Sequence, residues 1–274
     1  MSEPALQLSE PPVSVLTFVV GHSQCALDVR RVLFLAEYRN EARQVPVTAP
    51  GMVGLISARG QYVPLYDLAG ILGVLSLGAE KRELIALMIA REQDHVAWLD
   101  ALRDALHSGK TFEKTTDPHA CAFGRWYDSF HTDDEELSET LKAFDEPHRA
   151  IHALGRRLLD LAQDGHRDRA LDSLRVDGIT ILDRLRALFG VARDRLESSI
   201  RPVTILVADA AGRPQFAWLV DRIHQVREFP PEAIHGPEAV GVVLPAESLM
   251  RGMLRDGTGD FLWLDPPLAG ATRL

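Results

Sequence analysis

The chain has 274 residues, of which 46% are hydrophobic and 25% charged, and its net charge is −9. These values are typical of a globular protein with room for one large domain or two smaller ones. The negative charge disfavours a general nucleic-acid-binding role, which needs a basic surface. No stretch reaches the roughly 18 consecutive apolar residues of a membrane span, so we expect no direct membrane insertion.

The N-terminal residues and the two cysteines bear on whether the protein is expected in the cytoplasm or in an oxidising compartment. Met1–Pro12 lacks a basic stretch followed by an apolar one, so no signal peptide is expected. The two cysteines, Cys25 and Cys121, lie far apart in the sequence and do not make a disulfide framework. We therefore expect a reduced, cytoplasmic protein, which would need a membrane partner to respond to anything outside the cell.

The first part of the chain has the composition of β-structure. Val13–Val20 is rich in β-branched residues and ends at a Gly-His-Ser turn, which predicts a strand. Gln24–Ala36 has mixed strand and short-helix character. Gln61–Tyr66 predicts another strand, in which Pro64 favours an edge position or a bulge, because proline cannot donate a ladder hydrogen bond.

The middle part of the chain predicts helices, because apolar residues recur there at spacings of three and four. One stripe runs from Leu84 through Met88, His95, Trp98, Leu102 and Leu106, a second from Leu137 through Phe144, His148 and Ile151 to Leu158, and a third from Leu171 through Leu182 and Phe189 to Leu196. We expect two long outer helices, a short one near Cys121 and a broken one around Pro147. Glu83–Ala90 fits either a buried strand or the first turns of a helix.

The last part returns to β-structure, with expected strands at Val203–Val207, Gln215–Val220, Ala239–Leu244 and Asp260–Leu264. One uninterrupted helical block between two β regions indicates an insertion, because insertions are tolerated at exposed loops. The predicted organisation is therefore a split host, residues 13–80 and 200–268, around a helical domain at residues 81–199.

The helical block carries a candidate metal site at His95, Cys121, His148 and His152. His148 and His152 are four residues apart, so they project from one helix face. Three histidines and one cysteine make a tetrahedral zinc set, and the cysteine disfavours magnesium, calcium and manganese. Each residue alone is also explained as an ordinary core residue. His107, His119, His131 and His166 lie outside the apolar stripes, and we expect them at the surface.

The spacing of these residues resembles that of the chemoreceptor zinc-binding domain. The three parts of that family's pattern occur in order, as His95-x-x-Trp98, Cys121-x-Phe-Gly124-x-Trp and His148-x-x-x-His152. The resemblance implies that His95, Cys121, His148 and His152 bind zinc in a four-helix bundle. It also implies that the domain forms homodimers and regulates signalling proteins.

The flanks resemble the chemotaxis coupling protein CheW. A short apolar run followed by Arg59-Gly60, Pro64 and Asp67-Leu68 matches its characteristic stretch, and Phe216–Val226 matches a later one. Departures are Ser57-Ala58, where many members have Asn-Leu, and Phe34, where an acidic residue is usual. The resemblance implies an α+β protein with two small SH3-like β-barrels that bridges chemoreceptors and a histidine kinase, with Arg59 at the receptor-facing groove. Without it, Arg59-Gly60 is explained as a turn with a solvated arginine.

Together these features predict a chemotaxis signalling adaptor that is regulated by zinc and by oxidation of Cys121. A zinc-stabilised scaffold without sensing is the alternative. A zinc metalloenzyme is disfavoured because four protein ligands leave no coordination position for water, and no H-E-x-x-H, G-x-S-x-G or phosphate-loop motif is present. We therefore expect no enzymatic activity.

Overall fold

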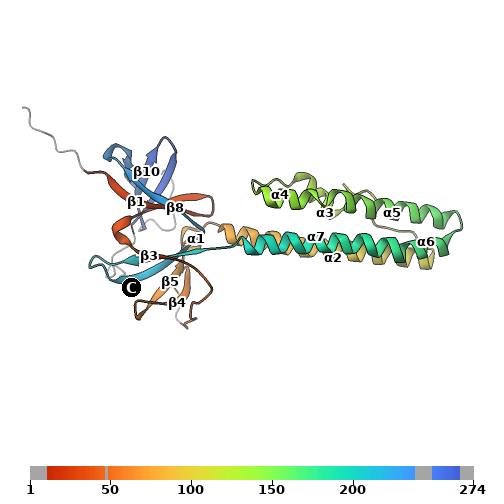
Figure 1. Ribbon diagram of the computed structural model, residues 1–274, viewed down its shortest axis with the longest axis horizontal. Helices are drawn as coiled ribbons and strands as arrows, with labels where there is room; N and C mark the ends of the chain where they lie inside the picture. Colours follow the sequence, from red (N-terminus) through yellow and green to blue (C-terminus); the bar gives the residue numbers. More distant parts are fainter. Residues whose placement is uncertain (1–10, 47–48, 238–248, 266–274) are drawn as a thin grey trace, which may run out of the picture. The chain divides into compact units, whose positions relative to one another are not determined.

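The computed structural model of the chain describes residues 11–46, 49–237 and 249–265. It divides into two compact units, which are shown in Figure 1. The flank unit comprises the described residues up to Glu80 and from Ile200 onward, and the helical unit is Lys81–Ser199. Within the described residues, no helix has the length and apolar character needed to span a membrane.

One sheet of the flank unit has six strands in the order β8-β1-β2-β11-β10-β9. Its strands are β1 (Val13–Val20), β2 (Ser23–Asp28), β8 (Arg222–Phe229), β9 (Ile234–His235), β10 (Met250–Asp256) and β11 (Gly259–Leu264). β1 pairs antiparallel with both β2 and β8, while β11 runs parallel to β2. This sheet therefore combines strands from both ends of the chain.

The second sheet has five strands in the order β3-β6-β7-β5-β4. Its strands are β3 (Val32–Glu37), β4 (Met52–Ala58), β5 (Gln61–Asp67), β6 (Val203–Ala208) and β7 (Pro214–Val220). β6 pairs with β3 and β7 runs parallel to β5, so strands that follow the helical unit lie between strands that precede it. Phe18, Leu27, Leu68 and Trp218, all nearly inaccessible to solvent, pack in one hydrophobic core.

The strands predicted at Val13–Val20, Gln61–Tyr66, Val203–Val207, Gln215–Val220 and Asp260–Leu264 are confirmed, with ends that agree to within two residues. The strand predicted at Ala239–Leu244 lies outside the described residues, as does the end of the host at 266–268.

Two expectations for the sheets are not met. Closed SH3-like barrels are not confirmed, because in the described part of the chain β8 and β9 are the free edges of one sheet and β3 and β4 those of the other. Of the two alternatives for Pro64, the edge position is wrong, since β5 lies between β4 and β7. The other alternative, a bulge, agrees with an irregularity in the β4–β5 ladder opposite the next residues, Leu65 and Tyr66. Proline is accommodated there because the ladder with β7 begins only at the next residue, Leu65.

The helical unit consists mainly of three long helical segments. The helices of the chain are α1 (Leu68–Leu72), α2 (Leu77–Ser108), α3 (Ala122–Ser129), α4 (Glu135–Lys142), α5 (Asp145–Gln163), α6 (Arg167–Ser173) and α7 (Ile179–Ser198), with a π-helical turn at Leu174–Gly178 and 3-10 turns at Val29–Arg31 and Pro231–Ala233. The π turn joins α6 and α7 into one segment. The predicted four-helix bundle is not confirmed as such, because the short α3 and α4 stand in place of a further long helix.

The sequence features explain where these helices begin and break. Pro147 is the third residue of α5, where its missing N–H costs no helical hydrogen bond, so the predicted break falls between α4 and α5. Glu83–Ala90 lies inside α2, which settles its assignment as helix. α2 and α7 lie side by side (Figure 1), and Glu92 of α2 forms ion pairs with Arg186 and Arg193 of α7.

Candidate metal centre

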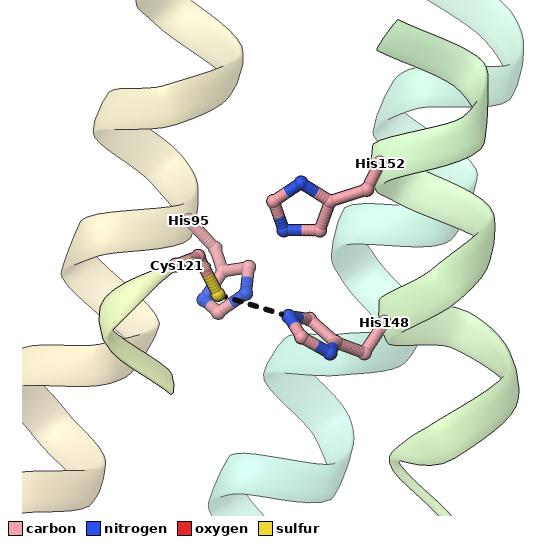
Figure 2. A group of neighbouring side chains, drawn as sticks. All are labelled: His95, Cys121, His148 and His152. Atoms are coloured by element: carbon pink, nitrogen blue, oxygen red, sulfur yellow. Dashed lines mark hydrogen bonds between the residues drawn. The ribbon is translucent and has the colours of Figure 1, made fainter. Parts of the chain in front are cut away.

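The structure brings His95, Cys121, His148 and His152 together. One ligand atom from each residue lies within 4.8 Å of the others, and the three histidines are buried. Figure 2 shows that α2 supplies His95, α5 supplies His148 and His152, and Cys121 stands at the start of α3. Three segments that are separate in the sequence thus meet at one point.

The ring orientation of His95 is fixed by its own helix. The carbonyl oxygen of Arg91 lies 2.7 Å from His95 Nδ1, and since a carbonyl can only accept, Nδ1 carries the proton and donates. Nε2 of His95 therefore keeps a free lone pair, and this buried atom has no hydrogen-bond partner among the described residues. This arrangement leaves Nε2 as the metal-ligating nitrogen.

Cys121 is the N-cap residue of α3. The N–H of Gly124 donates to Cys121 Sγ over 3.1 Å, and the thiol donates to the Pro118 carbonyl oxygen over 3.3 Å. A helix N-terminus favours negative charge through its free N–H groups, so this position suits a thiolate. Burial raises the pKa of the free Cys121 thiol above its usual value, so the metal itself would have to stabilise the thiolate.

His148 and His152 project from one face of α5, as their spacing predicts. His148 Nε2 lies 3.2 Å from Cys121 Sγ, and both ring nitrogens of His152 are buried without a hydrogen-bond partner in the described structure. Burial is the main cause that lowers the pKa of His148 to about 3 and the pKa of His152 to about 4. Both rings are therefore neutral at pH 7, which is the form that binds metals.

Aromatic side chains enclose the cluster. The Phe123 ring lies 4.8 Å from the His148 ring and 5.6 Å from the His95 ring, and Phe189 of α7 lies 5.9 Å from His95. These phenylalanines are almost fully buried. The resulting low-polarity shell explains the lowered pKa values of the histidines and strengthens any interaction between the ligands and a cation.

The cluster fits a zinc ion. A tetrahedral zinc site with bonds of about 2.0–2.3 Å places its ligand atoms roughly 3.3–3.6 Å apart, so the present spacing needs only small side-chain movements. Imidazole and thiolate are the ligands zinc prefers, and four of them close the coordination shell. Without a bound metal, Nε2 of His95 and both ring nitrogens of His152 would be buried with no hydrogen-bond partner among the described residues, which costs free energy of folding.

A cavity of about 290 Å³ opens on the cluster, and its lining includes Cys121, Asp94, Lys114 and Arg125. Cys121 is accordingly half-buried, whereas the three histidines are almost inaccessible. The sulfur is thus the ligand that small solutes in this cavity reach most readily.

The remaining candidate residues lie elsewhere. His107, His119, His131 and His166 are exposed, as expected, and His119 Nδ1 lies 2.9 Å from an Asp128 carboxylate oxygen. Arg59 is the exposed first residue of the turn between β4 and β5, with a left-handed φ of 48°.

The sequence motifs do not reveal what surrounds the ligands. Phe189, a member of a predicted apolar helical stripe, packs against His95, and Gly155 accommodates the Trp98 ring. A glycine inside an otherwise regular helix, as at position 155, is the sequence feature that could have indicated a close contact there.

Comparison with known protein families gives one match to the helical part of the chain and one to the part that precedes it. The family model of the chemoreceptor zinc-binding domain matches residues 95–159, and that of the CheW-like domain matches residues 14–106. No curated protein matched the chain.

Two solved structures are similar over large parts of their length. The scaffolding protein TtCheW from Thermoanaerobacter tengcongensis is 10% identical, with 93% of this chain and 90% of that chain covered and a TM-score of 0.42. The regulatory CZB domain of DgcZ is 18% identical, with 43% of this chain and 98% of that chain covered and a TM-score of 0.37. The family matches confirm both resemblances seen in the motifs: residues 14–106 are similar to the CheW-like domain and residues 95–159 to the chemoreceptor zinc-binding domain.

Proposed function

We propose that the helical unit binds one zinc ion through His95, Cys121, His148 and His152. The observation that carries the proposal is the convergence of four ligand atoms from three segments. Among the described residues, Nε2 of His95 and both ring nitrogens of His152 are buried without a hydrogen-bond partner. Four protein ligands leave no open position for a catalytic water. The ion therefore serves structure or regulation, and the proposal assigns no enzymatic activity to the chain.

Metal content tests this ligand set. Purified protein should contain about one zinc per chain by elemental analysis, and Cys121→Ser and His148→Ala should each lose most of it. His107→Ala is the matched control, because His107 is an exposed histidine of the same unit, outside the segment that carries Cys121, and its loss should leave the zinc in place. Full zinc content in both ligand variants would show that the assignment is wrong.

We infer that the flank unit is a chemotaxis signalling adaptor that bridges chemoreceptors and a histidine kinase in the cytoplasm, because a CheW-like family model matches most of its first half. Arg59 is the proposed contact residue, since an exposed arginine on a tight turn is free to meet a partner. Arg59→Glu should weaken co-purification with receptor and kinase, while stability changes by less than about 0.5 kcal/mol. Arg169→Glu, at an exposed site of the helical unit, is the charge-matched control.

The helical unit is proposed to be an inserted module, because both sheets already combine strands from the two flanks. A chain in which a short Gly/Ser linker replaces residues 81–199 should unfold cooperatively and retain its β-structure by circular dichroism. An unfolded product would show that the helical unit is required for the flank unit to fold.

Zinc occupancy is proposed to regulate the adaptor. α2 begins at Leu77, four residues before the helical unit starts at Lys81, and the same helix carries His95. Receptor-controlled kinase activity should therefore change when a chelator removes zinc. Zinc-dependent stability without any change in coupling would instead identify a zinc-stabilised scaffold.

Cys121 is proposed as a redox trigger of the same site. His95 and His152 also line the cavity, but they are almost inaccessible, whereas Cys121 is half-buried. A peroxide would oxidise the zinc-bound thiolate to a sulfenic acid and be reduced to water, and loss of the anionic sulfur would weaken zinc binding. Zinc release on treatment with peroxide, measured together with coupling, tests the idea. The absence of any release would remove it and leave direct zinc sensing.

Homodimerisation is proposed through the face of α2 where Ile89 is 41% exposed. A hollow of about 450 Å³ beside Ile89 and Val96 could accept apolar side chains of a second copy. Sedimentation equilibrium should show a dimer that Ile89→Glu dissociates. Monomeric wild-type protein, with or without zinc, would contradict this part of the proposal.

A further inference from the structure

Cys121 reaches the cluster at the end of a connection without regular structure. Residues 109–120, between α2 and α3, form neither helix nor strand. A connection of this kind is mobile unless specific contacts hold it. The position of the sulfur therefore depends on whatever anchors this segment.

Trp98 provides such an anchor. Its indole N–H donates to the Thr115 carbonyl oxygen over 2.8 Å, and its ring packs edge-on against Phe112 with centroids 5.4 Å apart. The same ring lies 5.0 Å from the ring of His152. One buried side chain thus contacts both the segment that carries Cys121 and a candidate ligand on α5.

α5 is shaped to receive this indole. A Cβ atom on Gly155 would lie 2.3 Å from Trp98 Cη2 and 3.0 Å from Cζ2, so no larger residue fits without moving the ring. Gly155 is three residues after His152, about one turn along the same helix face. A glycine inside a helix costs about 1 kcal/mol relative to alanine, and here it provides the space for Trp98.

We propose that Trp98 is a positioning residue of the metal site: it fixes the segment that ends at Cys121 at the distance where Cys121 and His152 can share one ion. The inference rests on the zinc site proposed above and assigns to Trp98 a role beyond filling the core. Partners one layer outside a metal typically contribute about 10–100-fold to its affinity when they orient the ligands.

Two variants of the full-length chain separate positioning from packing. Trp98→Phe keeps an aromatic ring and loses the N–H, while Gly155→Ala keeps the indole and displaces it. The controls are Trp218→Phe, which removes the same atoms from the core of the flank unit, and Gly190→Ala, at a helical glycine with open space around it. Zinc affinity is measured by competition with a chromogenic chelator. The rate of Cys121 alkylation in the zinc-free folded protein is measured by peptide mass spectrometry. Helical circular dichroism reports whether the helical unit, which contains Cys121, stays folded, and buried Cys25 reports the same for the flank unit.

Both test variants should bind zinc about 10–100-fold more weakly and alkylate faster at Cys121, with the helical circular dichroism unchanged, while both controls behave like the wild type. The inference is overturned if Cys121 alkylates at the wild-type rate in both variants, even where zinc binding is weaker, because Trp98 would then be a core residue only. Unchanged zinc affinity also overturns it. A wild-type protein that binds no zinc would instead reject the proposed metal site itself.

Discussion

The zinc-free helical unit should lose stability as the pH falls from 7 to 5, chiefly because of His148 and His152. Their pKa values in the folded chain are about 3 and about 4, mainly because of burial, against about 6.5 in an unfolded chain. As the pH falls through about 6.5, the unfolded chain binds a proton on each ring and the folded chain does not. Stability is therefore full above this pH and is lost as the pH approaches the folded-state values.

The size of the effect follows from these pKa values. Each pH unit between the folded and unfolded pKa of one ring changes the free energy of unfolding by about 1.4 kcal/mol. Between pH 7 and pH 5 each ring accounts for about 2 kcal/mol, and the two together for about 4 kcal/mol. This is a large part of the roughly 5–15 kcal/mol by which domains are stable, so the zinc-free unit should be close to unfolding at pH 5.

Urea unfolding in the presence of a chelator, followed by helical circular dichroism at several pH values, measures this loss. The double variant His148→Asn/His152→Asn should have a flatter pH dependence, with the remainder due to His95, whose pKa burial also lowers. The exposed-site variant His107→Asn should keep the wild-type slope. The reasoning fails if the double variant loses stability with pH as steeply as the wild type, because other groups would then be responsible.

Three further substitutions have expected outcomes. Gly124→Ala should cost about 1–3 kcal/mol and weaken zinc binding, because its Cβ would lie 1.8 Å from the Pro118 carbonyl oxygen; unchanged urea unfolding and zinc titration would contradict this. Arg59→Gly should raise stability by about 1 kcal/mol, because it relieves a left-handed backbone; a lower melting temperature would argue for a structural contact of the arginine. Asp221→Asn should lower the free energy of unfolding by about 1 kcal/mol and speed amide exchange at Gly21 and Gly78, because the Asp221 carboxylate accepts hydrogen bonds from these two N–H groups at 2.7 and 3.3 Å. Equal exchange rates in the variant and the wild type would show that these bonds contribute little.

Local patterns in the sequence predict the elements that depend on local physics. The run of β-branched residues from Val13 and the turn after Val20 define β1 to the residue, because both signals act within a few positions. The inward histidines could be predicted for the same reason, since His148 and His152 share a stripe with Ile151 and Leu158. Helical periodicity directs these side chains to the core whatever the tertiary arrangement.

The order of strands could not be read in the same way. Nothing local in Val203–Ala208 indicates that it pairs with Val32–Glu37, because that pairing depends on contacts across the whole inserted block. The edge position of Pro64 was predicted wrongly for a related reason. A proline indicates that one ladder hydrogen bond is missing, but it does not indicate whether a neighbouring strand lies on the side of the missing bond. The role of Trp98 depends on Gly155 and Thr115, which are distant in the sequence and meet only in the folded chain.

The origin of the four ligands bears on how a metal could act on the adaptor. They come from α2, the start of α3, and α5, and of these three segments α2 is the one whose chain continues directly into the flank unit. Its first turn is held there by Asp221, which accepts from Gly78, while His95 lies 17 residues further on, about 26 Å along the helix. Zinc affinity should therefore be insensitive to Asp221, whereas any effect of zinc on the flank unit should depend on it.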